Sequence, residues 1–198
     1  MSDAETLSVY AAKAADYAKM TNGEAASPDL LRFISNLPKG GRVLDLGSGP
    51  GFSAGAMAAA GMDAHAWDPV PEMIEMAEKL PGVTARQAVY ADLTEIAAYD
   101  GIWCNFSMLH TPLVDWPDHF AAIARALKPS GLLHFGTKLG TGEKRDQIGR
   151  LYSYMTKDAL LALLNQTGFE VDFSRTGEDM GLDGKMARFI KVQGKKRG

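Results

Sequence analysis

The sequence has little of several features that mark specialised proteins. It has one cysteine, Cys104, which excludes an internal disulfide and a cluster of thiolate metal ligands. No run of about 18 apolar residues occurs, so we expect no membrane-spanning helix. Its 21 basic and 24 acidic residues give a net charge of −3, and only the short tail 191–198 is clearly basic. Nucleic-acid binding usually needs a larger basic face, so we expect no nucleic-acid partner.

Residues 1–20 do not show the basic start and apolar stretch of a secretory signal. Together with the single cysteine, this predicts a cytoplasmic protein. The 198 residues are enough for one domain with a sizeable core. No linker, repeat or low-complexity segment divides them, so we expect a single domain over 1–198. Neither composition nor periodicity indicates an oligomeric state.

The sequence does contain an alternation of short apolar runs and helical stretches, which is typical of βαβ units around a mainly parallel sheet. We predict parallel strands at 42–46, 63–67, 83–87, 100–106 and 132–138. Two final strands, at 169–174 and 186–192, are joined without a helix and should pair as an antiparallel hairpin. Helices are predicted over 4–20, 28–36, 52–60, 72–79, 116–127 and 156–167. The stretch 139–149 is rich in glycine and charge and is predicted to be a surface loop.

The most informative segment is Val43–Gly51 (VLDLGSGPG), where an apolar strand runs into a glycine-rich turn that opens a helix. Glycines there allow unusual backbone angles and close approach of a ligand, and ligands of open α/β sheets bind at the carboxyl ends of strands. The dinucleotide fingerprint is Gly-x-Gly-x-x-Gly, but Phe52 stands where its third glycine belongs. Asp45 would repel a pyrophosphate and favour an ammonium group. The loop therefore favours S-adenosylmethionine over a nicotinamide dinucleotide.

Two carboxylates follow the next two predicted strands. Asp68 comes directly after 63–67, and a carboxylate at that place can accept hydrogen bonds from both hydroxyls of a ribose. Both candidate cofactors contain this ribose, so Asp68 does not distinguish them. Asp92 follows the third strand, and two compatible roles stay open for it. It can accept a hydrogen bond from an adenine amino group or cap the short helix that follows.

These residues resemble the class I S-adenosylmethionine-dependent methyltransferases. Val43–Gly51 is similar to the first motif of that family, and Asp68-Pro69 with Met73 is similar to the second. The resemblance continues through Ala91-Asp92-Leu93, Tyr99–His110 and Arg125–Leu132, so that it covers about residues 40–138. It implies a small, single-domain enzyme of the small-molecule type. The implied fold is α/β, a three-layer Rossmann-like sandwich with seven strands in the order 3-2-1-4-5-7-6 and strand 7 antiparallel.

The resemblance also implies which residues bind the cofactor. The first motif would surround the methionyl part, Asp68 would take the ribose, and Met73 and Asp92 would lie at the adenine. The end of the fourth strand would lie near the sulfonium, and two tyrosines of the N-terminal segment 1–36 would close over the site or else pack as ordinary helix residues. The implied set is Tyr10, Tyr17, Asp45, Gly47, Ser48, Gly49, Gly51, Asp68, Pro69, Met73, Asp92, Leu93, Asn105 and Phe106.

Methyl transfer from a sulfonium is an in-line displacement, which an enzyme promotes by aligning the reacting atoms and excluding water. A general base is needed only where the acceptor must lose a proton to attack. His110 follows the fourth strand and is the candidate catalytic base. Its alternative role is a loop histidine that hydrogen-bonds the backbone. The other histidines show no metal-ligand spacing, so we expect no metal.

Polar side chains crowd the segment after the fifth predicted strand, and we expect 139–155 to lie on the substrate side. The candidate substrate-binding residues are Lys138, Arg145, Arg150 and Tyr152. The two arginines could hold a carboxylate or phosphate, and Tyr154 could add to the wall. The alternative is a solvated loop with internal ion pairs. The segment Gly177–Gly184 could cap the site or form a simple hairpin turn.

Specialised acceptors are disfavoured by the end of the fourth strand. Asn105-Phe106-Ser107-Met108 departs from the Asn/Asp-Pro-Pro-aromatic pattern of enzymes that methylate nucleic-acid amino groups, and Cys104 lacks the preceding proline of cytosine C5 enzymes. Our first hypothesis is methyl transfer from S-adenosylmethionine, leaving S-adenosylhomocysteine, to an oxygen, nitrogen or carbon atom of a small molecule. The alternatives are a regulatory protein that binds these ligands without turnover and an NAD(P)-dependent oxidoreductase.

Overall fold

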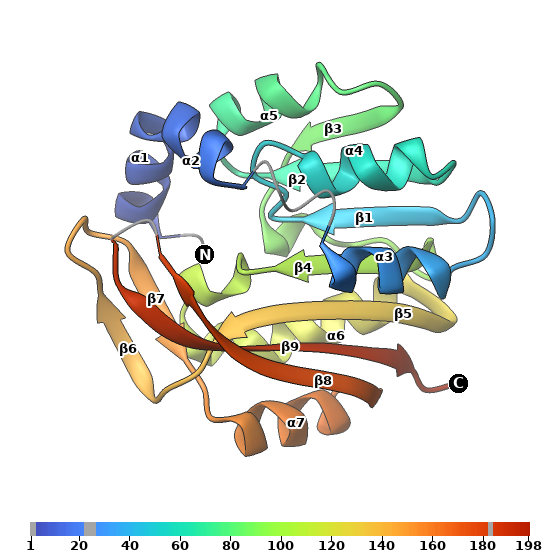
Figure 1. Cartoon of the computed structure of the whole chain (residues 1–198). Helices are drawn as coiled ribbons and strands as arrows, with labels where there is room; N and C mark the ends of the chain where they lie inside the picture. Colours follow the sequence, from blue (N-terminus) through green and yellow to red (C-terminus); the bar gives the residue numbers. More distant parts are fainter. Residues whose placement is uncertain (1–2, 22–26, 182–183) are drawn as a thin grey trace.

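The computed structural model of the chain describes residues 3–21, 27–181 and 184–198 (Figure 1). The helices are α1 (Ala4–Ala12), α2 (Ala14–Thr21), α3 (Pro28–Ser35), α4 (Phe52–Ala59), α5 (Pro71–Ala77), α6 (Trp116–Ala126) and α7 (Lys157–Gln166). The strands are β1 (Arg42–Leu46), β2 (Asp63–Asp68), β3 (Val83–Gln87), β4 (Tyr99–Asn105), β5 (Leu127–Lys138), β6 (Gly142–Arg145), β7 (Leu151–Tyr154), β8 (Phe169–Met180) and β9 (Met186–Lys196). Among the described residues, the short 3₁₀ turns are η2 (Tyr90–Asp92), η3 (Met108–His110) and η4 (Leu113–Asp115).

Seven strands form one sheet in the order β3-β2-β1-β4-β5-β9-β8. The strands from β3 to β5 pair in parallel, and β9 pairs antiparallel with both β5 and β8. Because β8 and β9 are the sixth and seventh strands of this sheet, the predicted order 3-2-1-4-5-7-6 is confirmed. The two final strands are longer than predicted, because β8 continues to Met180 and β9 continues to Lys196.

Alternate side chains of the strands pack on opposite faces of the sheet, as the two-residue period of a strand requires. Val43 and Trp103 face α3 and α4, whereas Leu44, Ile102 and Phe135 belong to the cluster that includes α6 and α7. Figure 1 shows the resulting three layers, with helices on both faces of the sheet. This burial on both faces explains why β1, β4 and β5 read as nearly continuous apolar runs.

Local signals set several helix ends. Ser27 caps α3, where its hydroxyl accepts a hydrogen bond from the Leu30 N–H and Pro28 is the first helical residue. Thr156 caps α7 in the same way, through the N–H of Ala159. The single helix expected over 4–20 is in fact two helices, because the chain leaves the helical geometry at Lys13. Among the described residues, none of the helices combines the length and apolar character needed to cross a membrane.

The segment 139–155, expected on the substrate side, contains a β-hairpin, and its first strand lies within the predicted surface loop 139–149. Strands β6 and β7 pair antiparallel and form a separate two-stranded sheet. The residues of β6 are all exposed, whereas Tyr152 and Ser153 of β7 are buried. An exposed strand of glycine and charged residues carries no apolar alternation, so periodicity could not reveal it. In Figure 1 the hairpin lies beside the N-terminal helix α1, near the end of the sheet where β1, β4 and β5 finish.

Candidate active site

The glycine loop after β1 is folded tightly between the end of β4 and helix α2. Gly47 and Gly49 have φ angles of +75° and +53°, which favour glycine because a Cβ would be strained there. A Cβ on Gly47 would lie 2.2 Å from the Cβ of Ser107, and one on Gly49 would lie 3.2 Å from the ring of Tyr17. The loop therefore presents bare backbone to the space beside it.

Asp68 ends β2 and turns its carboxylate toward that loop. Its Oδ2 accepts a hydrogen bond of 2.8 Å from the Gly49 N–H, and its Oδ1 accepts one of 2.9 Å from the Val70 N–H. The side chain is 8% exposed. Burial raises the pKa of Asp68 to about 6, although the two N–H donors oppose that rise. Each oxygen keeps a lone pair beyond its bond to the backbone, so a bound diol can be accepted as well.

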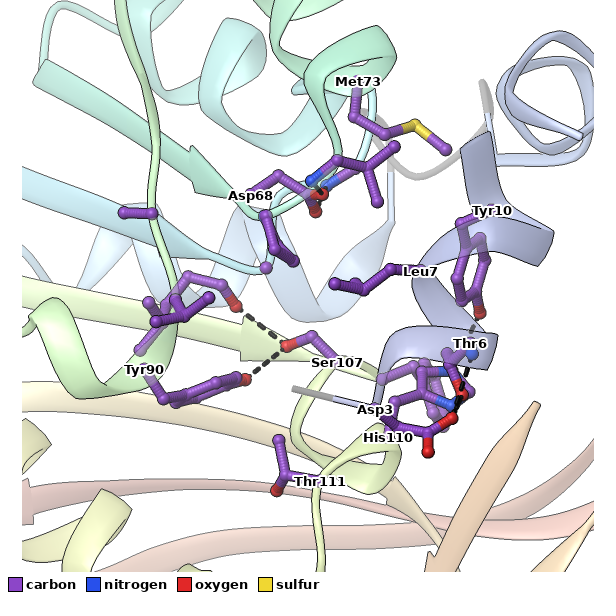
Figure 2. A pocket seen from close by; sticks show the side chains of 18 of the residues that line it. Asp3, Thr6, Leu7, Tyr10, Asp68, Met73, Tyr90, Ser107, His110 and Thr111 are labelled. Atoms are coloured by element: carbon purple, nitrogen blue, oxygen red, sulfur yellow. Dashed lines mark hydrogen bonds between the residues drawn. The ribbon is translucent and has the colours of Figure 1, made fainter. Parts of the chain in front are cut away.

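A first pocket opens beside Asp68 and the glycine loop (Figure 2). In Figure 2, Asp68 and Met73 lie on one side, and Leu7 and Tyr10 of α1 lie across from them. Ser107 lies deeper, where its hydroxyl donates to the Leu46 carbonyl at 2.8 Å. The pocket is lined by Asp3, Thr6, Leu7, Tyr10, Tyr17, Leu46, Gly47, Gly49, Asp68, Pro69, Val70, Met73, Ala88, Val89, Tyr90, Phe106, Ser107, His110 and Thr111.

A second pocket adjoins the first. Its walls come from α2, the end of β5, the hairpin and the outer ends of β8 and β9. The two pockets share four lining residues, which are Tyr10, Tyr17, Phe106 and His110. We call this shared wall the junction. The two pockets therefore meet at these four side chains.

Phe106 follows β4 in a left-handed conformation, with a φ angle of +54°. Such a conformation is costly for a bulky residue, and it occurs where the surroundings fix the chain and a site needs the geometry. Here the Phe106 N–H donates to the Gly136 carbonyl at 2.8 Å. The conformation places the Phe106 ring at the junction.

A hydrogen-bond chain crosses the junction from β7 to α1. His110 Nδ1 lies 2.6 Å from the Leu151 carbonyl, and because a carbonyl only accepts, Nδ1 carries the proton. His110 Nε2 therefore accepts from the Tyr10 hydroxyl at 2.8 Å. The Tyr10 oxygen in turn accepts from Arg150 Nη1 at 2.8 Å. Arg150 is 1% exposed, and its guanidinium is paired with Asp146 at 2.8 Å.

Burial sets the charge of these groups. It lowers the pKa of His110 to about 3, and the nearby cations Arg150 and Lys138 add to this effect. It raises the pKa of Tyr10 to about 12, against the opposing influence of Arg150. At neutral pH the imidazole is therefore neutral and the phenol is protonated. His110, the predicted candidate base, lies at the junction, and both of its ring nitrogens already have hydrogen-bond partners; its bond to a backbone carbonyl corresponds to the alternative structural role.

Most of the residues predicted to bind the cofactor line the first pocket, as its lining set shows. Asp45, Ser48 and Asn105 lie instead around a small third pocket that also touches Gly47 and Tyr17. The Asp45 carboxylate is buried and accepts a hydrogen bond of 3.2 Å from the Ala54 N–H of α4. It therefore lies under the glycine loop rather than in the first pocket.

Three predicted cofactor residues lie away from these pockets. Asp92 is exposed, and its carboxylate accepts from the Val89 N–H at 2.9 Å, which is a local role in η2. Leu93 is buried in the main core. Gly51 precedes α4 with a φ angle of +81°, and a Cβ there would lie 2.7 Å from the Cβ of Ala77. The structure thus gives Gly51 a packing role, and the pocket wall expected from Asp92 consists of Ala88, Val89 and Tyr90.

Of the predicted substrate-binding residues, Lys138, Arg150 and Tyr152 line the second pocket. Arg145 does not. Its guanidinium lies on the outside of the hairpin, where it binds Asp3 at 2.8 Å and Glu5 at 3.2 Å. Arg145 therefore fastens α1 to β6.

Two further predictions concern Tyr154, expected in the pocket wall, and the segment Gly177–Gly184, expected to cap the site. Tyr154 stacks on Tyr152 at 5.9 Å, away from the pocket wall. Asp179, Met180 and Gly181 of the expected cap line the second pocket, whereas residues 182–183 lie outside the described part of the chain.

Several site residues were not predicted. Asp3, Thr6 and Leu7 reach the first pocket from α1, but nothing in that alanine-rich helix marks them as ligand-facing. Ala187, Phe189 and Lys191 of β9 reach the second pocket. They are spaced two residues apart along one strand, so the sequence alone could have predicted that they lie on the same face of the sheet. Searched over the described residues, the structure brings no group of three potential metal ligands together.

The first pocket fits S-adenosylmethionine in its chemistry. A buried carboxylate with free acceptor capacity suits the two ribose hydroxyls, and the apolar side chains of Leu7, Val70 and Met73 suit a flat purine. The bare backbone at Gly47 and Gly49 permits close approach of the rest of the molecule. Asp45 beneath the loop is compatible with a ligand that carries an ammonium group and unfavourable for a pyrophosphate.

Comparison with known proteins agrees with this chemistry. A family model described as a methyltransferase domain matches residues 17–173. No curated protein matches the chain at a significant level.

Similar solved structures include the 1,6-didemethyltoxoflavin-N1-methyltransferase of Burkholderia thailandensis, which contains bound 1,6-didemethyltoxoflavin and S-adenosylhomocysteine. That structure is 21% identical with a TM-score of 0.80, over 98% of this chain and 88% of the other. A methyltransferase from Methanosarcina mazei is 18% identical with a TM-score of 0.73, over 86% of this chain and 98% of the other. The chain therefore belongs to the methyltransferase-domain family, and it is a class I enzyme that depends on S-adenosylmethionine.

Proposed function

We propose that this protein methylates an oxygen, nitrogen or carbon atom of a small molecule, in the cytoplasm, with the acceptor held in the second pocket. The main support for the proposal is the junction between the two pockets. Two adjoining pockets share the side chains of Tyr10, Tyr17, Phe106 and His110. A donor in one pocket and an acceptor in the other would meet there.

The residues of the junction would act mainly by position. When bound, S-adenosylmethionine supplies an electrophilic methyl group on a sulfonium. Tyr10 and Tyr17 meet edge to face at 5.1 Å, and the Tyr17 ring lies over Gly49, so the two rings would help to exclude water from the reacting atoms. Alignment and exclusion of water are effective for this type of displacement.

We propose that His110 is a positioning residue. Its imidazole accepts the Tyr10 hydroxyl and donates to the Leu151 carbonyl, and so it joins α1 to β7 across the junction. A histidine whose pKa is about 3 is a weak proton acceptor at neutral pH. At saturating S-adenosylmethionine, where ionisation of Asp68 no longer limits binding, we therefore expect the pH profile of turnover to lack the inflection near neutral pH that an ordinary histidine base would give.

A small acceptor agrees with the size of the chain and with one structural neighbour. The Burkholderia thailandensis enzyme contains a small molecule, 1,6-didemethyltoxoflavin, beside S-adenosylhomocysteine. In this protein the second pocket is lined by described residues of the same chain that forms the first pocket. A protein that bound the donor without turnover would need only the first pocket, so the adjoining second pocket supports a place for the acceptor.

Two measurements test the proposal. Calorimetric titration should show binding of S-adenosylhomocysteine and no binding of NAD. Incubation of the protein with methyl-labelled donor and a metabolite extract should yield a labelled product of low molecular mass. Label recovered only in material of high molecular mass would contradict the small-molecule acceptor, and preference for NAD would contradict the assignment of the first pocket.

A further inference from the structure

A row of buried side chains crosses the sheet on the face that carries α3. Trp103 of β4 pairs in register with His134 of β5, and His134 pairs with Gln193 of β9. Neighbours in register have their side chains on the same face of a sheet. The rings of Trp103 and His134 stack at 3.5 Å, and His134 and Gln193 are 0% and 1% exposed. Polar groups buried to this extent are normally paired with one another.

Helix α3 fixes the direction of the hydrogen bonds in this row. Gln193 Nε2 donates to the backbone carbonyl of Asp29 at 2.8 Å, and because a carbonyl only accepts, the nitrogen of the Gln193 amide must face it. The same nitrogen lies 3.4 Å from His134 Nδ1. Burial holds the pKa of His134 well below its usual range, so the imidazole is neutral. Nδ1 therefore accepts, and the single ring proton is on Nε2.

The protonated nitrogen of His134 determines how the amide of Asn105 is turned. His134 Nε2 lies 3.3 Å from Asn105 Oδ1, so it donates to the amide oxygen. Asn105 can lie over β5 because its partner in register there is Gly136, where a Cβ would lie 2.2 Å from Asn105 Oδ1. The bonds of the row are long, but turning the Asn105 amide around would place two donors against each other in a buried site. The amide oxygen thus faces β5, and the amide nitrogen is turned away from it.

Asn105 also lines the small third pocket beside the glycine loop. That pocket touches Gly47 and Tyr17, which line the first pocket as well. Phe52 and Ser53 at the start of α4 are further lining residues, and the N-terminus of a helix favours a negative group. The amide N–H groups of Asn105 and the start of α4 therefore both suit a hydrogen-bond acceptor with negative charge.

The methionyl end of S-adenosylmethionine carries one group of each kind. Its ammonium only donates hydrogen bonds, and its carboxylate only accepts them. An amide N–H of Asn105 can therefore bond only to the carboxylate. Asp45 lies around the same pocket, and its negative charge suits the ammonium. The third pocket thus has a suitable group for each end of the zwitterion.

Resting on the donor site of the proposed function, we propose that His134 and Gln193 are positioning residues for the methyl donor. They hold the amide of Asn105 so that its N–H groups face the carboxylate of the bound donor. His134 and Gln193 act through Asn105, and neither of them needs to touch the donor. The inference does not depend on which small molecule accepts the methyl group.

Three ligands that differ only at the methionyl end test this inference. They are S-adenosylhomocysteine, its decarboxylated analogue, which keeps the ammonium, and methylthioadenosine, which lacks both charged groups. Each is titrated calorimetrically into the wild type and into His134→Phe, which keeps a ring to stack on Trp103 but has no N–H. We expect His134→Phe to bind S-adenosylhomocysteine about tenfold more weakly, which corresponds to about 1.4 kcal/mol. The affinities for the other two ligands should be unchanged.

Three more variants sharpen the test. His134→Gln should restore most of the affinity for S-adenosylhomocysteine, because a glutamine amide can place an N–H near the position of Nε2. Asn105→Asp turns a carboxylate oxygen away from β5 in place of the N–H groups. It should weaken S-adenosylhomocysteine and strengthen the decarboxylated analogue. His65→Phe is the matched control, because His65 of β2 lines neither the first nor the third pocket, and it should bind all three ligands as the wild type does.

The outcomes separate this inference from the proposed function. Failure of the wild type to bind S-adenosylhomocysteine would contradict the donor site itself. Normal binding by the wild type, with equal losses for all three ligands in His134→Phe, would reduce His134 to a structural residue and overturn the inference. Unchanged affinity for S-adenosylhomocysteine in that variant would overturn it too. An unaltered ligand preference in Asn105→Asp would show that the amide does not face the carboxylate.

Discussion

Replacement of Asp68 by asparagine tests the first pocket directly. The variant keeps the size of the side chain and removes its charge. In the wild type both carboxylate oxygens already accept backbone N–H groups, from Gly49 and Val70, and we propose that they also accept the ribose hydroxyls. A hydrogen bond to a charged group contributes about 1.5–3 kcal/mol. Loss of one such bond should therefore raise the dissociation constant of S-adenosylhomocysteine about tenfold to a hundredfold.

The affinity for S-adenosylhomocysteine should also change with pH in a defined direction, which provides a second test of the same assignment. The ionised carboxylate is the stronger acceptor, so binding favours the deprotonated form of Asp68. In the free protein burial raises the pKa of Asp68 to about 6. Affinity should therefore be constant at higher pH and weaken as the pH falls through that value. At about one unit below the pKa, roughly a tenth of the carboxyl groups are ionised, so the dissociation constant should rise about tenfold.

Calorimetric titration of wild type and Asp68→Asn across this pH range measures both effects. The variant should bind weakly and with little dependence on pH in the acid range. Asp92→Asn is the matched control, because Asp92 is an exposed carboxylate outside the first pocket, and its affinity should equal that of the wild type. Equal affinity of wild type and Asp68→Asn, or the same pH dependence in both, would refute the assignment of Asp68 to the ribose.

Two further substitutions probe the loop and the N-terminal helix. Gly47→Ala should lower the free energy of unfolding by more than about 2 kcal/mol, because its Cβ would overlap Ser107. Gly61 has a similarly positive φ of +86° but open space around it, so Gly61→Ala should lower the free energy of unfolding by about 1 kcal/mol. Equal losses of unfolding free energy for the two variants, measured by urea denaturation, would contradict the steric argument. Arg145→Gln should speed amide hydrogen exchange across 3–12 and weaken S-adenosylhomocysteine binding severalfold, and unchanged exchange would show that Arg145 does not fasten α1.

The fold could be predicted from the sequence because its signals are local or periodic. Apolar runs such as those of β1 and β4 are buried on both faces, and helices began where Ser27 and Thr156 supplied caps. The hairpin of β6 and β7 could not be predicted in this way. Its exposed strand has no apolar alternation, and its place depends on distant contacts, such as the bond of 2.8 Å from the Leu151 N–H to the hydroxyl of Thr6.

The same distinction between local signals and distant contacts applies to the candidate site. Gly47, Gly49 and Asp68 follow strands of one sheet, so chain order alone places them together at its edge. Arg145 and Asp92 also have residue types suited to ligand binding, and both follow a strand of the sheet or its edge. In the structure, however, Arg145 is paired with Asp3 and Asp92 accepts from the Val89 N–H. Such competition between partners is not visible in a sequence, because the competing partner can lie anywhere in the chain.

Helix α1 links the two pockets physically. It forms one wall of the first pocket through Leu7, and it contributes Tyr10 to the junction. The same helix is fastened to the hairpin through Thr6 and Tyr10, which bond to Leu151 and Arg150. Any movement of α1 that opens the first pocket therefore also withdraws a wall of the second. The second pocket is complete only while α1 covers the first, so under the proposed function we expect donor and acceptor to be bound at the same time.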